Sequence, residues 1–138
     1  MSYLIDTCAL SELIRPTPSP LVIRWFEAAP QTALFISALT LGEIRKGVEK
    51  LPGGPRRAQI AAWLEIELPD WFGDRVLAVD ATVADEWGRL TARAGPQLPA
   101  IDGLIAATAL RHRLTIVTRN VGDFVKSGVE IVNPWEDR

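Results

Sequence analysis

Five short, almost entirely apolar runs alternate along this chain with longer segments in which apolar residues recur every three or four positions. Such runs predict strands covered on both faces, and the longer segments predict amphipathic helices. The alternation predicts an α/β fold, a three-layer α/β/α sandwich built on a five-stranded parallel sheet. The predicted strands are Tyr3–Ile5, Leu34–Ile36, Val76–Val79, Thr115–Val117 and Val129–Val132.

The length of 138 residues suits a single domain spanning 1–138. The strongest turn signal, Pro52-Gly53-Gly54-Pro55, predicts a tight connection between two helices rather than a domain boundary. No apolar run approaches the roughly 20 residues of a membrane span, and no basic leader precedes the first strand. We therefore expect a cytoplasmic protein that does not contact membranes.

Cysteine and histidine counts restrict the chemistry further. The single cysteine excludes an intrachain disulfide, and the single histidine excludes a metal site built on several histidines. A net charge of −2 disfavours nucleic-acid binding by bulk charge alone. A nucleic-acid enzyme that uses metal ions and a local basic patch remains compatible with this charge.

Acidic and small polar residues gather where the predicted strands end. Ligands of open parallel sheets bind beyond the carboxyl ends of the strands, so this rim is the expected site. Asp6 directly follows the first strand, and Asp102 lies in the opening turn of the helix before the fourth strand. The other rim candidates are Ser37, Glu43, Thr118, Asn120 and Asp123.

Each acid also has a purely structural interpretation. Asp6 fits a helix N-cap, Asp102 fits the helix dipole, and Asp123 fits a turn. Glu43 completes a capping box if its helix begins at Thr40, but it is free to bind a ligand if the helix begins at Ser37. By the same reasoning Asp80 is interpreted as structural.

Taken together, the acids on one rim favour a metal site. Two carboxylates about 4 Å apart repel by roughly 4 kcal/mol at an effective dielectric constant of 20. Such a group needs cations or bound protons. Carboxylate, hydroxyl and amide oxygens select a hard ion, Mg²⁺ or Mn²⁺. The implied chemistry is phosphodiester hydrolysis by a metal-activated water.

Four segments resemble the four signatures of PIN-domain nucleases in order and spacing. They are Leu4-Ile5-Asp6-Thr7, Ser37–Ile44, Leu98–Asp102 and Thr118–Phe124. Val132-Asn133-Pro134-Trp135 and the stretch from Val79-Asp80 to Trp87-Gly88 resemble the FitB-like branch of VapC toxins. The resemblance covers essentially the whole chain and implies a sheet in the order 3-2-1-4-5.

The resemblance also assigns roles by position. Asp6, Glu43 and Asp102 match the core metal-binding carboxylates, and Asp123 matches the fourth acid, which would act partly through water. The residues that would hold the acidic pocket or the substrate are Thr7, Ser37, Thr118 and Asn120. Cys8 stands where many relatives carry Asn, and we expect its side chain to point away from the metal as a small buried filler.

The resemblance further implies a divalent-metal-dependent endoribonuclease that dimerises and is neutralised by a cognate antitoxin of the VapB or FitA type. DNA contact would then be indirect, through the antitoxin. A local patch of basic residues would steer RNA, with Arg119 the best placed. The candidates for that patch are Arg45, Lys46, Arg56, Arg57, Arg111, Arg113, Arg119 and Lys126.

Three other functions were weighed. A DNA nuclease of similar architecture is compatible, because acid-plus-metal chemistry does not itself read the 2′-hydroxyl. A non-catalytic PIN domain that only sequesters a partner would not need the full set of acids. A receiver-like signalling module needs two adjacent acids after the first strand and a suitably placed late lysine, which this chain lacks.

Overall fold

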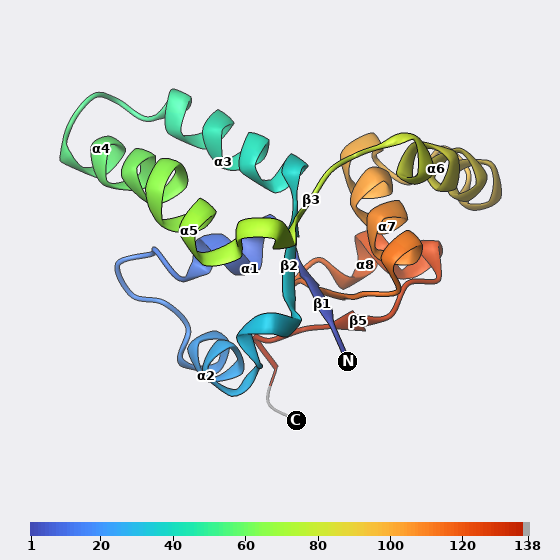
Figure 1. Cartoon of the computed structure of the whole chain (residues 1–138), viewed down its shortest axis with the longest axis horizontal. Coiled ribbons are helices and arrows are strands. Elements are labelled where there is room, and N and C mark those ends of the chain that lie inside the picture. The colour runs from blue at the N-terminus through green and yellow to red at the C-terminus, as the bar shows by residue number, and fades with distance from the viewer. Residues whose placement is uncertain (137–138) are drawn as a thin grey trace.

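The computed structural model describes residues 1–136 and contains a five-stranded sheet in the order β3-β2-β1-β4-β5 with every neighbouring pair parallel. Both the predicted order and the flanking helices are confirmed (Figure 1). Residues 137 and 138 of the predicted domain lie outside the described residues. The strands are β1 (Tyr3–Ile5), β2 (Leu34–Ser37), β3 (Val76–Leu77), β4 (Thr115–Val117) and β5 (Ile131–Val132).

Helices cover both faces of this sheet. A π-helical stretch, Trp63–Glu67, joins α4 to α5, and the turn at residues 52–54 separates α3 from α4 as predicted. The helices are α1 (Thr7–Glu12), α2 (Pro20–Ala28), α3 (Ala38–Lys50), α4 (Pro55–Ala62), α5 (Leu68–Phe72), α6 (Ala81–Ala94), α7 (Ala100–His112) and α8 (Val121–Phe124). Within residues 1–136, no helix is long and apolar enough to cross a membrane.

Alternation along the strands builds two separate hydrophobic cores. Leu4 and Ile116 point to one face, where they pack with α6, α7 and α8, whereas Ile5 and Val117 point to the other. That second face carries α1 and the arm formed by α3, α4 and α5 (Figure 1). The sheet therefore separates two helical layers, and its carboxyl edge lies between them.

Two predicted strands are longer than the observed ones. The run that begins at Val76 ends at Leu77, and the last strand starts at Ile131 rather than Val129. Each is an edge strand with one neighbour. Its ladder of hydrogen bonds therefore covers fewer residues than the apolar run suggests. Val129 is instead buried in the core beneath α6 and α7.

The packing of α6 against α7 fixes the start of α7. Gly103 lies so close to Trp87 that an added Cβ would sit 3.1 Å from the indole Nε1. Glycine permits this approach, which brings the first turn of α7 against α6. Asp102, the preceding residue, is thus carried by a helix end that is held by packing rather than by a loop.

Asp80 caps α6, as its structural interpretation predicts. Its carboxylate accepts hydrogen bonds from the Val83 backbone N–H at 3.0 Å and from Thr82 at 2.7 Å. These hydrogen bonds hold the pKa of Asp80 below its usual value. We expect Asp80→Ala to lower the unfolding temperature by a few degrees through loss of the cap. Calorimetry checks this, and the chemistry of the rim acids should not change.

Candidate active site

Asp6 and Thr118 meet because their strands are neighbours in register. Ile5 pairs with Val117, and the ladder continues when the Asp6 N–H donates to the Val117 carbonyl at 2.9 Å. Thr118 directly follows β4, and its hydroxyl donates to Asp6 Oδ2 at 2.7 Å. Both side chains are buried, with exposures of 5% and 0%. The geometry agrees with the expectation that Thr118 holds the acidic pocket.

The other oxygen of Asp6 caps α1. Asp6 Oδ1 accepts from the Thr7 N–H at 2.9 Å, so the structural interpretation of Asp6 is correct as far as it goes. Burial raises the pKa of Asp6 most, and hydrogen bonds from Thr118 and Thr7 partly offset this while the charge of Asp123 adds to it. A cap alone does not account for an acid that is buried beside other acids.

Thr7 connects the first strand to Glu43. Its hydroxyl donates to Glu43 Oε1 at 2.5 Å and also lies 3.2 Å from the Thr40 hydroxyl. Glu43 reaches this position because α3 begins at Ala38 with Ser37 as its N-cap. Of the two helix starts considered, the one at Ser37 is confirmed. Glu43 therefore lies beyond the first turn, free of capping.

Ser37 contributes to the site indirectly, because its side chain caps α3. Its hydroxyl is fully buried and accepts from the Leu39 N–H at 3.0 Å, so it fixes the start of α3. That start determines where Glu43 projects. The expectation that Ser37 contacts substrate is not supported by a side chain with no exposed surface.

Asp102 completes the acid set from the opposite helical layer. Burial and the charges of three other acids together raise the pKa of Asp102 to about 6. Burial contributes most, followed by the charges of Asp6, Asp123 and Glu43. None of the described groups that act on Asp102 is a cation or a hydrogen-bond donor. The charges of Asp6, Asp123 and Glu43 thus all act on Asp102, and no cation or donor offsets them there.

The segment after β4 supplies the remaining candidates. Asp123 is exposed in the first turn of α8, and the Asn120 N–H donates to the Thr118 hydroxyl at 3.0 Å. The Arg119 guanidinium stacks over the Trp135 ring at 4.3 Å from the centroid. This contact holds Arg119 against the C-terminal segment, so its role as the leading RNA-steering residue receives no support from the geometry.

The prediction that the Cys8 side chain points away from the acidic site was wrong. Its Sγ lies 3.7 Å from Asp6 Oδ2 and 3.4 Å from the Thr118 hydroxyl, within the network that holds Asp6. Burial and then the charge of Asp6 raise the pKa of the thiol, which disfavours a thiolate nucleophile. The thiol instead adds a weak donor beside Asp6. Cys8 lies two residues after the N-cap Asp6, at the same end of α1. This spacing in the sequence could have predicted the contact between Cys8 and Asp6.

The donor set fits a hard divalent cation in composition. It contains carboxylates from Asp6, Glu43 and Asp102, and Asp6 Oδ1 and Glu43 Oε1 each accept one hydrogen bond and keep a second lone pair. Mutual repulsion and burial favour a bound cation. Among residues 1–136, however, no three His, Cys, Asp or Glu side chains already stand in a metal-binding arrangement.

A cavity of about 600 Å³ is lined by one of the rim acids, Glu43. Thr7, Lys46, Lys50 and Ile101 also line it. Ile101 is apolar but 41% exposed. Gly103 in the same turn of α7 packs against Trp87 of α6, whereas Ile101 faces the cavity.

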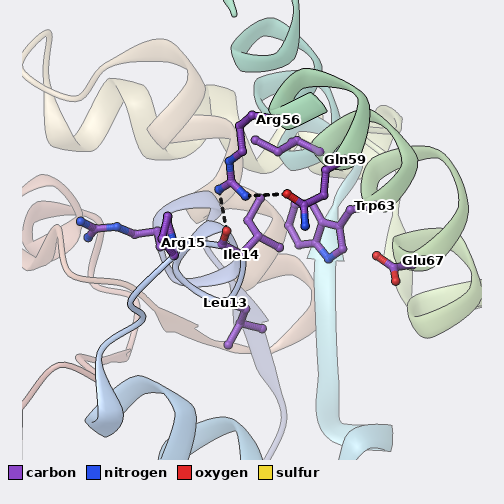
Figure 2. Close-up of a pocket in the computed structure, with 9 residues that line it drawn as sticks. Leu13, Ile14, Arg15, Arg56, Gln59, Trp63 and Glu67 are labelled. Carbon is purple, nitrogen blue, oxygen red and sulfur yellow. Dashed lines mark hydrogen bonds between the residues drawn. The ribbon is translucent and has the colours of Figure 1, made fainter. Parts of the chain in front are cut away.

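A second cavity, of about 560 Å³, lies between the end of α1 and the α4 arm (Figure 2). It contains none of the rim acids. Arg56 is held there by the Ile14 carbonyl at 2.6 Å and by Gln59 at 3.1 Å. This cavity is therefore separate from the candidate active site.

A buried acid was missed by sequence reasoning. Glu12 is 4% exposed and accepts from the Ser19 N–H at 2.8 Å and from Arg15 at 3.2 Å. Burial alone would raise the pKa of Glu12, but these hydrogen bonds and the charges of Arg15 and Arg119 lower it overall. Glu12 ties the loop after α1 in place, and its position at the end of a short helix carries no distinguishing signal.

Comparison with known proteins identifies the architecture. The profile of the PIN domain family matches residues 3–126, which includes all four rim acids. The chain belongs to the PIN-domain family. The resemblance read from the four sequence signatures is thereby confirmed, and with it the PIN-domain sheet order.

Curated relatives match this PIN domain over nearly its whole length. The toxin FitB of Neisseria gonorrhoeae is 36% identical over 137 residues, covering 97% of this chain and 99% of FitB. A VapC ribonuclease, Y4jK of Sinorhizobium fredii, is 36% identical over 135 residues, covering 96% of each chain. The plasmid stability protein StbB of Pseudomonas syringae is 35% identical over 136 residues, covering 96% of this chain and 98% of StbB.

Solved structures agree. A structure of FitAB bound to the IR36 DNA fragment aligns with a TM-score of 0.93 at 33% identity, covering 99% of this PIN domain and 97% of the matched chain. FitAcB from Neisseria gonorrhoeae aligns with a TM-score of 0.91 at 35% identity, covering 96% and 98% of the two chains. The whole backbone, including the elements that carry the rim acids, therefore follows that of the FitB-type PIN domains.

Proposed function

We propose that this PIN domain, spanning residues 1–138, is a divalent-metal-dependent endoribonuclease and the toxin of a toxin–antitoxin pair. The proposal is supported by the hydrogen bonds that hold Asp6 and Glu43, and by the charges of Asp6, Glu43 and Asp123 that act on Asp102. Relatives named as a toxin and as a VapC ribonuclease, each matched end to end, support the same conclusion.

Asp6, Glu43 and Asp102 would hold Mg²⁺ or Mn²⁺, with Asp123 acting through water. When bound, the cation would supply an activated water and would stabilise charge on the phosphate. Thr118 and Cys8 would keep Asp6 oriented, and Thr7 would do so for Glu43. Asn120 would help through the backbone hydrogen bond that positions the Thr118 hydroxyl. Arg119 remains a candidate for contact with RNA further from the scissile bond.

A small antitoxin is the proposed protein partner. Two solved structures with end-to-end similarity are FitAB bound to a DNA fragment and FitAcB. We propose that this PIN domain likewise binds its own antitoxin of that type, that any DNA contact runs through the antitoxin, and that the chain forms a homodimer.

Removal of divalent cations tests the catalytic part. The purified protein is expected to cut a mixed RNA substrate with Mg²⁺ or Mn²⁺ and to lose cleavage completely in chelator, because the uncompensated acids otherwise repel the phosphate. Gel analysis and mapping of the cut ends measure this. Restoration by Mg²⁺ or Mn²⁺ is the control.

Two results would contradict the proposal. Cleavage that persists in chelator would remove the metal mechanism. Cleavage of DNA in preference to RNA of the same sequence would favour the DNA nuclease considered above. The side-by-side comparison of RNA and DNA substrates separates these outcomes.

A further inference from the structure

The two carboxylate oxygens of Asp6 have different sets of neighbours. Oδ2 accepts from the Thr118 hydroxyl at 2.7 Å and from the Cys8 thiol, whose Sγ lies 3.7 Å away. Oδ1 accepts from the Thr7 N–H at 2.9 Å. Each carboxylate oxygen carries two lone pairs. Within residues 1–136, both lone pairs of Oδ2 are therefore engaged by protein donors, and the lone pair that Asp6 has left for a ligand is on Oδ1.

The contacts of Thr118 determine which proton each group supplies. An ionised carboxylate only accepts hydrogen bonds, so the Thr118 hydroxyl must donate to Asp6. The Thr118 oxygen accepts in turn from the Asn120 N–H at 3.0 Å. Cys8 Sγ lies 3.4 Å from the same oxygen, so the thiol contacts both members of the pair. The thiol proton is then the one that can reach the second lone pair of Oδ2.

Two separate elements bring these donors to one oxygen. Cys8 lies in the first turn of α1, which Asp6 itself caps. Thr118 directly follows β4, which pairs with the strand that precedes Asp6. Asp6 is only 5% exposed and Thr118 is fully buried. Packing therefore holds the plane of the Asp6 carboxylate in addition to the hydrogen bonds.

The number of oxygens that a carboxylate can offer affects which cation it favours. Ca²⁺ accepts both oxygens of one carboxylate in a flexible arrangement of ligands, whereas Mg²⁺ is smaller and demands near-octahedral geometry. A carboxylate restricted to one oxygen therefore favours the smaller ion over the larger one.

We propose that Cys8 and Thr118 are positioning residues that restrict Asp6 to binding a cation through Oδ1, and that they thereby select Mg²⁺ over Ca²⁺. Cys8 completes this restriction, because its thiol engages the lone pair of Oδ2 that Thr118 leaves free. This inference rests on the proposed metal site and adds the residues that set its selectivity.

Removal of the thiol tests the inference. Cys8→Ala should free one lone pair of Oδ2, so the ratio of Ca²⁺ affinity to Mg²⁺ affinity should rise about tenfold, as expected for an outer partner of a metal ligand. Cys8→Ser keeps a donor at this position and should retain the ratio of the unaltered protein. Titration calorimetry with each cation alone, in the absence of RNA, measures both affinities.

A second variant and a matched control accompany this test. Thr118→Val removes the other donor to Oδ2 and should shift the ratio in the same direction as Cys8→Ala. Thr108→Ala trims a fully buried side chain on α7, whose hydroxyl donates to the Leu104 carbonyl at 2.8 Å. This control should lower the unfolding temperature by a few degrees and leave the ratio of affinities unchanged.

The outcomes separate the selectivity from the proposed function. An unchanged ratio in both Cys8→Ala and Thr118→Val would overturn the inference, while RNA cleavage by the unaltered protein in Mg²⁺ would leave the ribonuclease standing. The same shift in Thr108→Ala would trace the effect to lost stability and would also overturn it. A Cys8→Ser protein that behaves like Cys8→Ala would show that the donor has no role. If the unaltered protein binds neither cation, the proposed metal site and this inference both fall.

Discussion

Asp102→Asn is expected to cut RNA at least about a thousandfold more slowly than the unaltered protein, yet to unfold at a higher temperature in chelator. A metal that polarises the phosphate contributes several kcal/mol, and each 1.36 kcal/mol is a factor of ten in rate. The gain in stability follows from the raised pKa of Asp102, near 6, because its charge at pH 7.5 is disfavoured in the folded state. Partial exposure limits that gain to on the order of 1 kcal/mol.

Asp80→Asn is the matched control for Asp102→Asn. Asparagine caps a helix as well as aspartate does, and Asp80 lies outside the acid set, so both cleavage and unfolding temperature should stay close to those of the unaltered protein. Thermal unfolding with and without Mg²⁺, together with single-turnover cleavage, measures the effects. An Asp102→Asn protein that is less stable in chelator would show that the residue serves the fold rather than the cation.

Affinity for Mg²⁺ is expected to fall about tenfold between pH 7 and pH 5. A group with a pKa near 6 is mostly ionised at pH 7 and about one-tenth ionised at pH 5, and only the ionised form binds the cation. Calorimetric titration at several pH values measures the fall in affinity.

Stability without metal should change in the opposite sense. The folded protein keeps a proton on Asp102 up to about pH 6, whereas the unfolded chain releases it near the ordinary value of 3.8. This group therefore lowers stability as pH rises between those values. The Asp80→Ala variant should retain both profiles. An affinity for Mg²⁺ that is flat from pH 5 to pH 7 would contradict the involvement of Asp102.

Strand order and the rim of acids were predictable because both follow from local patterns. Short apolar runs mark strands, and residues that directly follow them fall at one edge of a parallel sheet. The start of α3 was ambiguous in the sequence, since serine at position 37 and threonine at position 40 are both residue types that favour the N-cap. Burial of Ser37 at the end of β2 decides between them, and burial depends on tertiary packing.

Other features depended on relationships that one-dimensional periodicity does not contain. Ile101 is an apolar residue in the first turn of α7, yet it is exposed and lines a cavity rather than the core. Cys8 contacts Thr118 across 110 positions of sequence, through the pairing of β1 with β4. The ion pairs of Arg45 with Glu65 and of Arg57 with Glu49 depend on how the α4–α5 arm folds back on α3.

The division of the interior into two cores has a consequence for how the protein responds to its cation. Glu43 is carried by the layer that packs on Ile5, and Asp102 by the layer that packs on Leu4, with Asp6 at the end of the strand between them. Local opening of either layer would therefore separate Glu43 from Asp102. An ion bound by both residues would hold the two helical layers together across the sheet. Loading with metal would then make the two layers unfold as a single unit.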